Sequence, residues 1–158
     1  MARNISNRKD IIDSRDIIAR LEELQDERDA LDEAVSEARD AADELDPDEE
    51  KDALREAEAA IDAAELTLQE FDDSDDGCEL RALKALADEG DGAEDWTYGA
   101  TLVRESYFTD YCRELLQDIG DLPKDLPDYI AIDWNATADN LRVDYSEVDF
   151  GGVTYLIR

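Results

Sequence analysis

The sequence predicts an α+β protein that is mainly helical, in which an N-terminal antiparallel coiled-coil hairpin precedes a small α+β domain that ends in a β-hairpin. Three observations lead to this fold class. Apolar residues recur at alternating steps of three and four through residues 17–71, which is the spacing of a coiled-coil seam. All aromatic residues except Phe71 lie in the second half of the chain. Near its end, Gly151-Gly152 separates two short segments of strand-like composition, as in a tight hairpin.

Residues 1–13 form a mildly basic stretch and are expected to be a flexible arm. A long helix is predicted to begin near Ser14. Its seam is interrupted only by Arg28 and otherwise consists of Ile17, Leu21, Leu24, Leu31, Val35, Ala38, Ala42 and Leu45. None of these positions is acidic, so every carboxylate of the helix is expected to lie off the seam.

A stop and a restart are predicted at residues 46–49, with Asp46 as a cap, Pro47 at the first helical position and Glu49 as the capping-box partner. The second helix runs to about residue 71, with the stripe Leu54, Ala57, Ile61, Ala64, Leu68 and Phe71. Because the turn is very short, the two helices must be antiparallel and bury their stripes against each other. Residues 14–74 thus form an acidic helical hairpin, whose Ala-rich seam is expected to allow a close approach.

The second domain, residues 75–158, follows an acidic linker at Asp72–Gly77. We expect regular structure where apolar periodicity is bounded by Gly, Pro or a capping Asp. The predicted elements are a helix over 79–88, a strand over 101–103, a helix over 107–119 ended by Gly120, a loop framed by Pro123 and Pro127, a helix from Asp133 to about Leu141, and a hairpin of 146–150 with 153–158.

Residues that carry most enzymatic and metal chemistry are missing or wrongly spaced. The chain has no His, so it has no imidazole that could act as a general base. Its two cysteines, Cys78 and Cys112, are too few to form a zinc site without His, and they are expected to be free thiols. Alternate residues of Asp72–Gly77 match the start of an EF-hand loop, but Leu83 stands where the bidentate Glu is required. We expect no enzymatic activity, no cofactor and no bound metal.

Charge is the dominant feature of the composition. The chain has 46 Asp and Glu against 16 Lys and Arg, a formal net charge of −30. Such an excess requires a special solvent or a partner that favours negative charge, because self-repulsion destabilises a compact state. Fourteen carboxylates lie in residues 13–46, one per ~3.5 Å of helix axis, against ~3.4 Å per phosphate on one DNA strand.

We therefore hypothesise that outward carboxylates imitate phosphates. Solvation of a coiled-coil exterior, and adaptation to high salt in a chain with only four Lys, are the alternatives. The candidate phosphate-mimicking residues are Glu22, Glu23, Asp26, Glu27, Asp29, Glu33, Glu37, Asp40, Glu44, Asp48, Glu49, Asp52, Glu56 and Asp62.

From residue 111 onward the chain resembles the C-terminal domain of the ArdA antirestriction proteins. The matching segments are Tyr111–Gly120, Leu122-Pro123, Ile132-Asp133-Trp134, Ala136–Leu141 and Val148–Tyr155. The resemblance implies a helix that ends at a Gly, a Pro-containing loop, a short helix and a closing hairpin. It also implies an acidic, dimeric DNA mimic of phages and mobile elements that inhibits type I restriction–modification enzymes. Residues 1–77 do not resemble that family.

The expected function is therefore inhibition of a host defence enzyme by competitive occupation of its DNA-binding groove, with a type I restriction–modification complex as first choice. A CRISPR surveillance complex or another defence nuclease is the alternative client, and an acidic coiled-coil adaptor with incidental charge is the alternative class. The expected partner is a basic DNA-binding protein in the host bacterial cytoplasm, with no direct contact to nucleic acid or membrane.

A homodimer is also expected, because a two-stranded hairpin leaves edges that invite pairing. The residues expected at its interface are Trp134, Tyr145, Phe150 and Tyr155.

Overall fold

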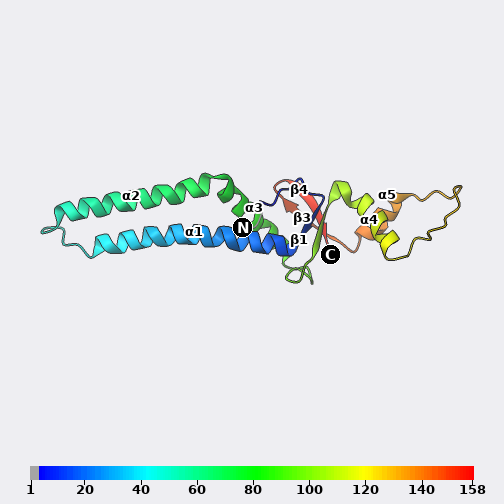
Figure 1. Ribbon diagram of the computed structural model, residues 1–158, viewed down its shortest axis with the longest axis horizontal. Coiled ribbons are helices and arrows are strands. Elements are labelled where there is room, and N and C mark those ends of the chain that lie inside the picture. Colours follow the sequence, from blue (N-terminus) through cyan, green and yellow to red (C-terminus); the bar gives the residue numbers. More distant parts are fainter. Residues whose placement is uncertain (1–3) are drawn as a thin grey trace. The chain divides into compact units, whose positions relative to one another are not determined.

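The computed structural model describes residues 4–158 and has the predicted mainly helical α+β fold (Figure 1). It divides into two compact units, residues 20–81 and residues 4–19 together with 82–158. The elements in chain order are β1 (Ile11–Asp13), α1 (Ser14–Asp43), α2 (Lys51–Asp73), α3 (Asp75–Gly90), β2 (Thr101–Arg104), the 3-10 turn η1 (Glu105–Tyr107), α4 (Phe108–Asp118), α5 (Trp134–Arg142), β3 (Ser146–Phe150) and β4 (Val153–Ile157).

The first unit is built on α1 and α2, which run antiparallel (Figure 1). Within residues 51–70, the side chains that are not exposed are those of the predicted stripe, Leu54, Ala57, Ile61, Ala64 and Leu68, and Phe71 behind them is buried. On α1, Leu24 and Val35 are buried. The seam predicted from the heptad spacing is therefore confirmed. Most of its other members are only half-buried, because each of two paired helices covers the other from one side only.

The turn between α1 and α2 corrects one prediction. Helix α2 begins at Lys51, and not at the proline of the turn. The Asp46 carboxylate accepts a hydrogen bond from the backbone N–H of Asp48 at 2.8 Å, so it caps the turn and not the helix. The reciprocal bond comes from Glu50, whose carboxylate accepts from the Asp46 N–H at 3.0 Å, and not from Glu49.

The predicted acidic linker at Asp72–Gly77 is also wrong, since Ser74 alone separates α2 from α3. Its hydroxyl donates to the Phe71 carbonyl at 2.6 Å and accepts from the Gly77 N–H at 3.2 Å. A serine in this position caps a helix, and the following Asp75 and Asp76 are favourable in a first helical turn because of the helix dipole. The boundary predicted near residue 74 therefore lies inside the first unit.

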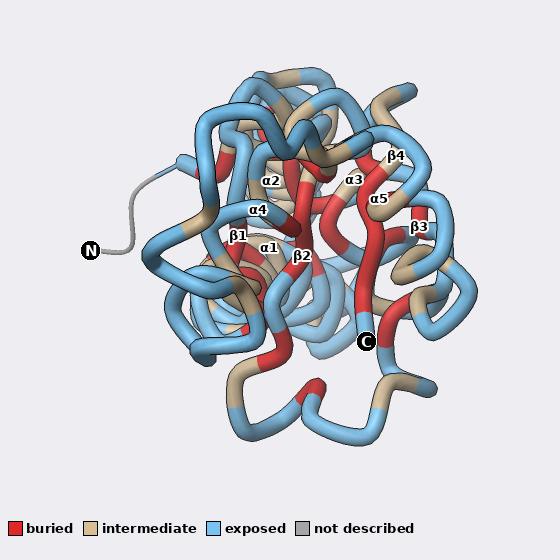
Figure 2. The backbone as a smooth tube through the Cα atoms, turned by 90° about the vertical axis from the view of Figure 1, so that its right-hand side faces the viewer, coloured by how far each residue is buried: buried red, intermediate tan, exposed pale blue. Residues whose placement is uncertain are grey.

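The second unit contains a four-stranded antiparallel sheet in the order β1-β2-β4-β3. One face carries Val103 and Leu156, which pack with Phe108, Cys112 and Ala138 of α4 and α5. The other face carries Ile12, Leu102 and Ile157, which lie opposite one another in the register of β1, β2 and β4. Because side chains alternate along a strand, Tyr155 and the buried residues of β3 lie on this face as well. Figure 2 shows the buried stretches of β2 and β4.

The flexible arm predicted for residues 1–13 is wrong for its described part, while residues 1–3 lie outside the described residues. Ile5 and Ile12 are buried, and Ile11–Asp13 forms the edge strand β1. The Tyr155 hydroxyl donates to the Lys9 carbonyl at 2.6 Å. The arm is ordered because residues 11–13 pair with the edge of β2 that β4 does not occupy. The unpaired N–H and C=O groups of such an edge favour the addition of a strand.

The local stop signals of the second unit are confirmed. Gly120 has φ +80° after α4, and Asp133 caps α5 by accepting from the Ala136 N–H at 3.0 Å. Gly151 and Gly152 have φ of +57° and +82°, the backbone that a two-residue hairpin turn requires and that glycine adopts at low cost.

Candidate phosphate-mimicking face

The candidate carboxylates of α1 lie on the side of that helix that faces away from α2. With Leu21 at position a and Leu24 at position d, heptad positions b, c and f of α1 face away from α2. Seven of the eight candidates between Glu22 and Asp40 occupy those positions, and Glu27 at position g is the other. All fourteen candidates are exposed except Glu23, which is half-buried. We name the exposed carboxylates Glu22, Asp26, Glu27, Asp29, Glu33, Glu37 and Asp40 the α1 acidic face.

The arginines of α1 within the first unit are bonded to carboxylates, two of them across to α2. Arg28 Nε lies 2.8 Å from Asp72 Oδ1, and Arg39 Nη2 lies 2.6 Å from Glu65 Oε1. Arg20 is held by its own ion-pair network. Each of these three arginines is thereby paired with a carboxylate of its own unit, although Arg39 remains largely exposed, so their positive charge is offset before a partner meets the α1 acidic face.

The spacing of these carboxylates is comparable to that of phosphates on a nucleic-acid strand. The seven residues of the α1 acidic face span about 27 Å of helix axis at a mean interval of ~4.5 Å, or ~3.9 Å if the half-buried Glu23 is counted, against ~3.4 Å per phosphate of one DNA strand. Residues 20–81 carry 26 acidic and six basic residues, a net charge of −20. By contrast, Lys51 and Arg55 lie in the first turns of α2, so the outer side of α2 is of mixed sign where it starts.

The most buried ion pair of the first unit lies at the base of the hairpin. Arg20 Nη2 is 2.9 Å from Glu79 Oε2 and 2.8 Å from Asp76 Oδ1, and Nη1 is 3.0 Å from Glu23 Oε2. The hydrogen bond to Glu79 raises the pKa of Arg20 above its ordinary value, although partial burial opposes this. This network joins α1 to α3 within the first unit. The sequence offers no local signal for the pairing of Arg20 with Asp76 and Glu79, because these residues lie more than 50 positions away.

The dimer interface predicted through the terminal hairpin needs correction. Phe150 and Tyr155 are 4% and 0% exposed, so their side chains belong to the core of the second unit. Strand β4 is an inner strand, flanked by β2 and β3. The edge that motivated the interface on β4 is therefore absent from the described sheet, while Trp134 and Tyr145 are half-buried and keep part of their surface.

Three further properties of the described residues concern metal ligands, thiols and the hydropathy of the helices. Residues 4–158 contain no group of three or more His, Cys, Asp or Glu placed to hold a metal ion. Cys78 is an exposed free thiol, and Cys112 is a buried one whose pKa is raised by burial. Among the same residues, no helix is both long enough and apolar enough to cross a membrane.

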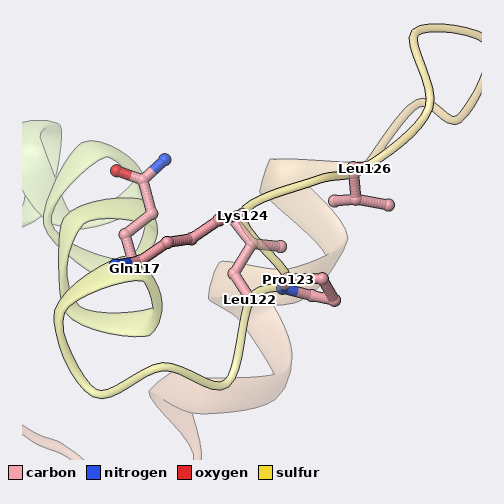
Figure 3. A pocket seen from close by; sticks show the side chains of 5 residues that line it. All are labelled: Gln117, Leu122, Pro123, Lys124 and Leu126. Atoms are coloured by element: carbon pink, nitrogen blue, oxygen red, sulfur yellow. The ribbon is translucent and has the colours of Figure 1, made fainter.

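A pocket of about 440 Å³ lies beyond the end of α4, in the second unit (Figure 3). Its lining is Gln117, Leu122, Pro123, Lys124 and Leu126. The Lys124 side chain extends toward Gln117 (Figure 3). The lining includes no carboxylate, so this pocket has a chemistry different from that of the α1 acidic face.

No protein-family model matches the chain, and neither a curated protein nor a solved structure is significantly similar to it. The second unit has a helix ended by Gly120, a Pro-containing loop, the short helix α5 and a closing hairpin. This is the order of elements that the ArdA resemblance implies, but a shared order of elements does not identify a function. The family assignment stays a prediction.

Proposed function

We propose that this protein is a DNA mimic that inhibits a DNA-binding host defence enzyme by occupying its DNA groove. The observation that carries the proposal is the α1 acidic face, on which carboxylates recur at a spacing comparable to that of a phosphate strand while the arginines of α1 within the first unit are bonded to carboxylates of that unit. The type of client, a type I restriction–modification complex, rests on the resemblance of residues 111–158 to ArdA. The bacterial cytoplasm is the proposed place of action.

The mechanism follows from how proteins bind nucleic acid. Grooves lined with Lys and Arg gain affinity when phosphates neutralise them and counterions are released. A line of carboxylates on a folded helix can pair with the same Lys and Arg side chains. It presents no bases, so the interaction does not depend on a DNA sequence. The protein and DNA then exclude each other from the groove, so inhibition is competitive and requires no chemical step.

The test is displacement of a fluorescent DNA duplex from a purified type I restriction–modification complex. A six-site variant replaces Glu22, Asp26, Asp29, Glu33, Glu37 and Asp40 with the corresponding amides. A matched variant makes the same change in net charge at six exposed positions of the second unit, Asp88, Asp91, Asp118, Asp121, Asp125 and Asp139. We expect the first variant to lose at least tenfold in inhibition and the second to lose little.

Salt dependence gives an independent readout. Inhibition should weaken steeply between about 50 and 200 mM salt, because each neutralised contact contributes to the slope. Equal losses for the two variants would show that net charge acts without a defined face. Simultaneous binding of DNA and this protein to one complex would refute mimicry, and activity only against a CRISPR surveillance complex would change the client and keep the mechanism.

An acidic coiled-coil adaptor is the second candidate, and the half-buried seam favours it. Leu21, Leu31 and Ile61 keep part of their surface in the hairpin, which is where a further helix of a partner could pack. An adaptor would bind through apolar contacts, so its affinity would change little with salt and would survive the six-site variant.

A further inference from the structure

A second pocket of the second unit is lined by acidic, aromatic and basic side chains together. It has a volume of about 510 Å³, within the range of small-ligand sites. Its principal lining residues are Glu94, Asp95, Tyr111, Leu115, Tyr145 and Arg158. The lining thus combines two carboxylates, two aromatic rings and one basic residue.

The acidic side of the pocket is a fixed turn. The Asp95 carbonyl accepts hydrogen bonds from the backbone N–H groups of Tyr98 at 3.0 Å and Gly99 at 2.9 Å. The hydroxyl of Ser14, which is fully buried, donates to the Trp96 carbonyl at 2.6 Å and accepts from the Ala100 N–H at 2.8 Å. The backbone that carries both carboxylates is therefore held in place before any ligand arrives.

The aromatic side is held equally well. The Tyr145 ring meets the Phe108 ring edge to face at 5.0 Å between centroids, and Tyr111 stacks on Phe108 at 6.3 Å. Phe108 is buried in the core, so both tyrosines are anchored to it while they line the pocket. Burial raises the pKa of Tyr145 to about 12, which keeps its hydroxyl neutral at physiological pH.

The charges around the pocket favour a cation. Within residues 4–158, neither Glu94 nor Asp95 forms an ion pair, whereas the nearby Arg15 is paired to Asp13 at 2.7 Å. Arg158 contributes one positive charge against the two carboxylates, so the lining keeps a net negative charge. The whole chain, at −30, adds to the attraction of a cation.

We propose that this pocket binds the side chain of an arginine presented by a partner protein. A planar guanidinium stacks on a tyrosine ring and donates two parallel hydrogen bonds to a carboxylate, whereas a lysine ammonium offers neither geometry. The site would add a specific anchor to an otherwise diffuse electrostatic contact. It stands on residues separate from the α1 acidic face, so it holds whether or not that face excludes DNA.

The test titrates the full-length chain with acetyl-Gly-Arg-Gly-amide and follows NMR signals of the backbone and the tyrosine rings. The matched peptide carries citrulline, which keeps the shape of arginine and removes its charge. We expect saturable shifts at Thr101, Tyr111 and Tyr145 with the arginine peptide, and binding of the citrulline peptide weaker by roughly tenfold or more. A lysine peptide should bind several-fold more weakly than the arginine peptide.

Substitutions at exposed positions distinguish arginine binding in the pocket from non-specific attraction to the acidic chain. Asp95→Asn should weaken arginine binding at least fivefold, and Asp91→Asn, in the same segment but outside the pocket lining, should leave it unchanged. Arg158→Gln should tighten it, because a competing cation is removed. Equal binding of arginine and citrulline, shifts confined to the hairpin carboxylates, or weaker binding by Arg158→Gln would each overturn the proposal, and none of these results bears on displacement of DNA.

Discussion

Replacing Arg20 with methionine should destabilise the hairpin unit strongly, although the same change elsewhere on α1 should not. The Arg20 side chain is 11% exposed and its main partner Glu79 is 5% exposed. Methionine fills a similar volume but takes the Arg20 counter-charge away from the Glu79 carboxylate, which stays buried. Breaking a buried ion pair in this way costs about 3–5 kcal/mol.

The lower end of that range applies, because the other two partners keep access to water. The side chains of Asp76 and Glu23 are 48% and 32% exposed. We therefore expect a loss of about 3 kcal/mol in the free energy of unfolding. For a chain of this size it corresponds to a fall in Tm of about 6–12 °C. Thermal unfolding followed by circular dichroism measures it.

Two comparisons identify the cause. Arg39→Met removes an ion pair whose side chains are 59% and 46% exposed, and it should cost less than about 1 kcal/mol. Adding Glu79→Gln to Arg20→Met removes the buried carboxylate charge that has lost Arg20, and should recover part of the loss. The reasoning is refuted if Arg20→Met unfolds within about 2 °C of the parent, or if the double variant is less stable than Arg20→Met alone.

Four further predictions concern the seam, the solvent, a tyrosine and the oligomer. Leu24→Asp places a charge at a fully buried seam position and should abolish much of the helical circular dichroism, while Ala30→Asp at an exposed position should preserve it. A mimic that works in an ordinary cytoplasm should remain folded at about 50 mM salt, whereas unfolding there, in a melt across salt concentrations, would favour salt adaptation. Burial raises the pKa of Tyr145 to about 12, above the ordinary value of about 10, so the folded state favours the neutral hydroxyl. The contribution of Tyr145 to the free energy of unfolding should be fully present below about pH 10 and should fall as the pH rises toward 12. Tyr145→Phe should remove this late step from a tyrosine titration. A homodimer should show a light-scattering mass of about twice 17.8 kDa that Trp134→Ala reduces to one chain, and a single-chain mass for the parent would reject it.

Local patterns in the sequence determined the helical seam and most element ends. A helix is held by hydrogen bonds between residues four apart, so the orientation of each side chain follows from its position in the sequence. The heptad pattern that includes Leu24 and Ile61 therefore predicts which side of each helix packs against the other helix. Glycines at φ above zero and a capping Asp133 act within two or three residues. For the same reason, the exposure of the α1 acidic face could be predicted from the spacing of its residues alone.

Tertiary structure alone decided how distant segments combine. Residues 11–13 pair with residues 101–103, and no local signal marks a partner about 90 residues away. That pairing lengthens the sheet. The equally distant pairing of residues 102–104 with residues 155–157 makes β4 an inner strand, and Tyr155 is buried where an exposed interface residue was predicted. Likewise, the side chains of Arg20 and Glu79, and the pocket between Asp95 and Tyr145, meet only when the chain has folded. Strand neighbours and buried ion pairs depend on contacts between distant residues, whereas periodicity and capping depend on the nearest turn of the chain.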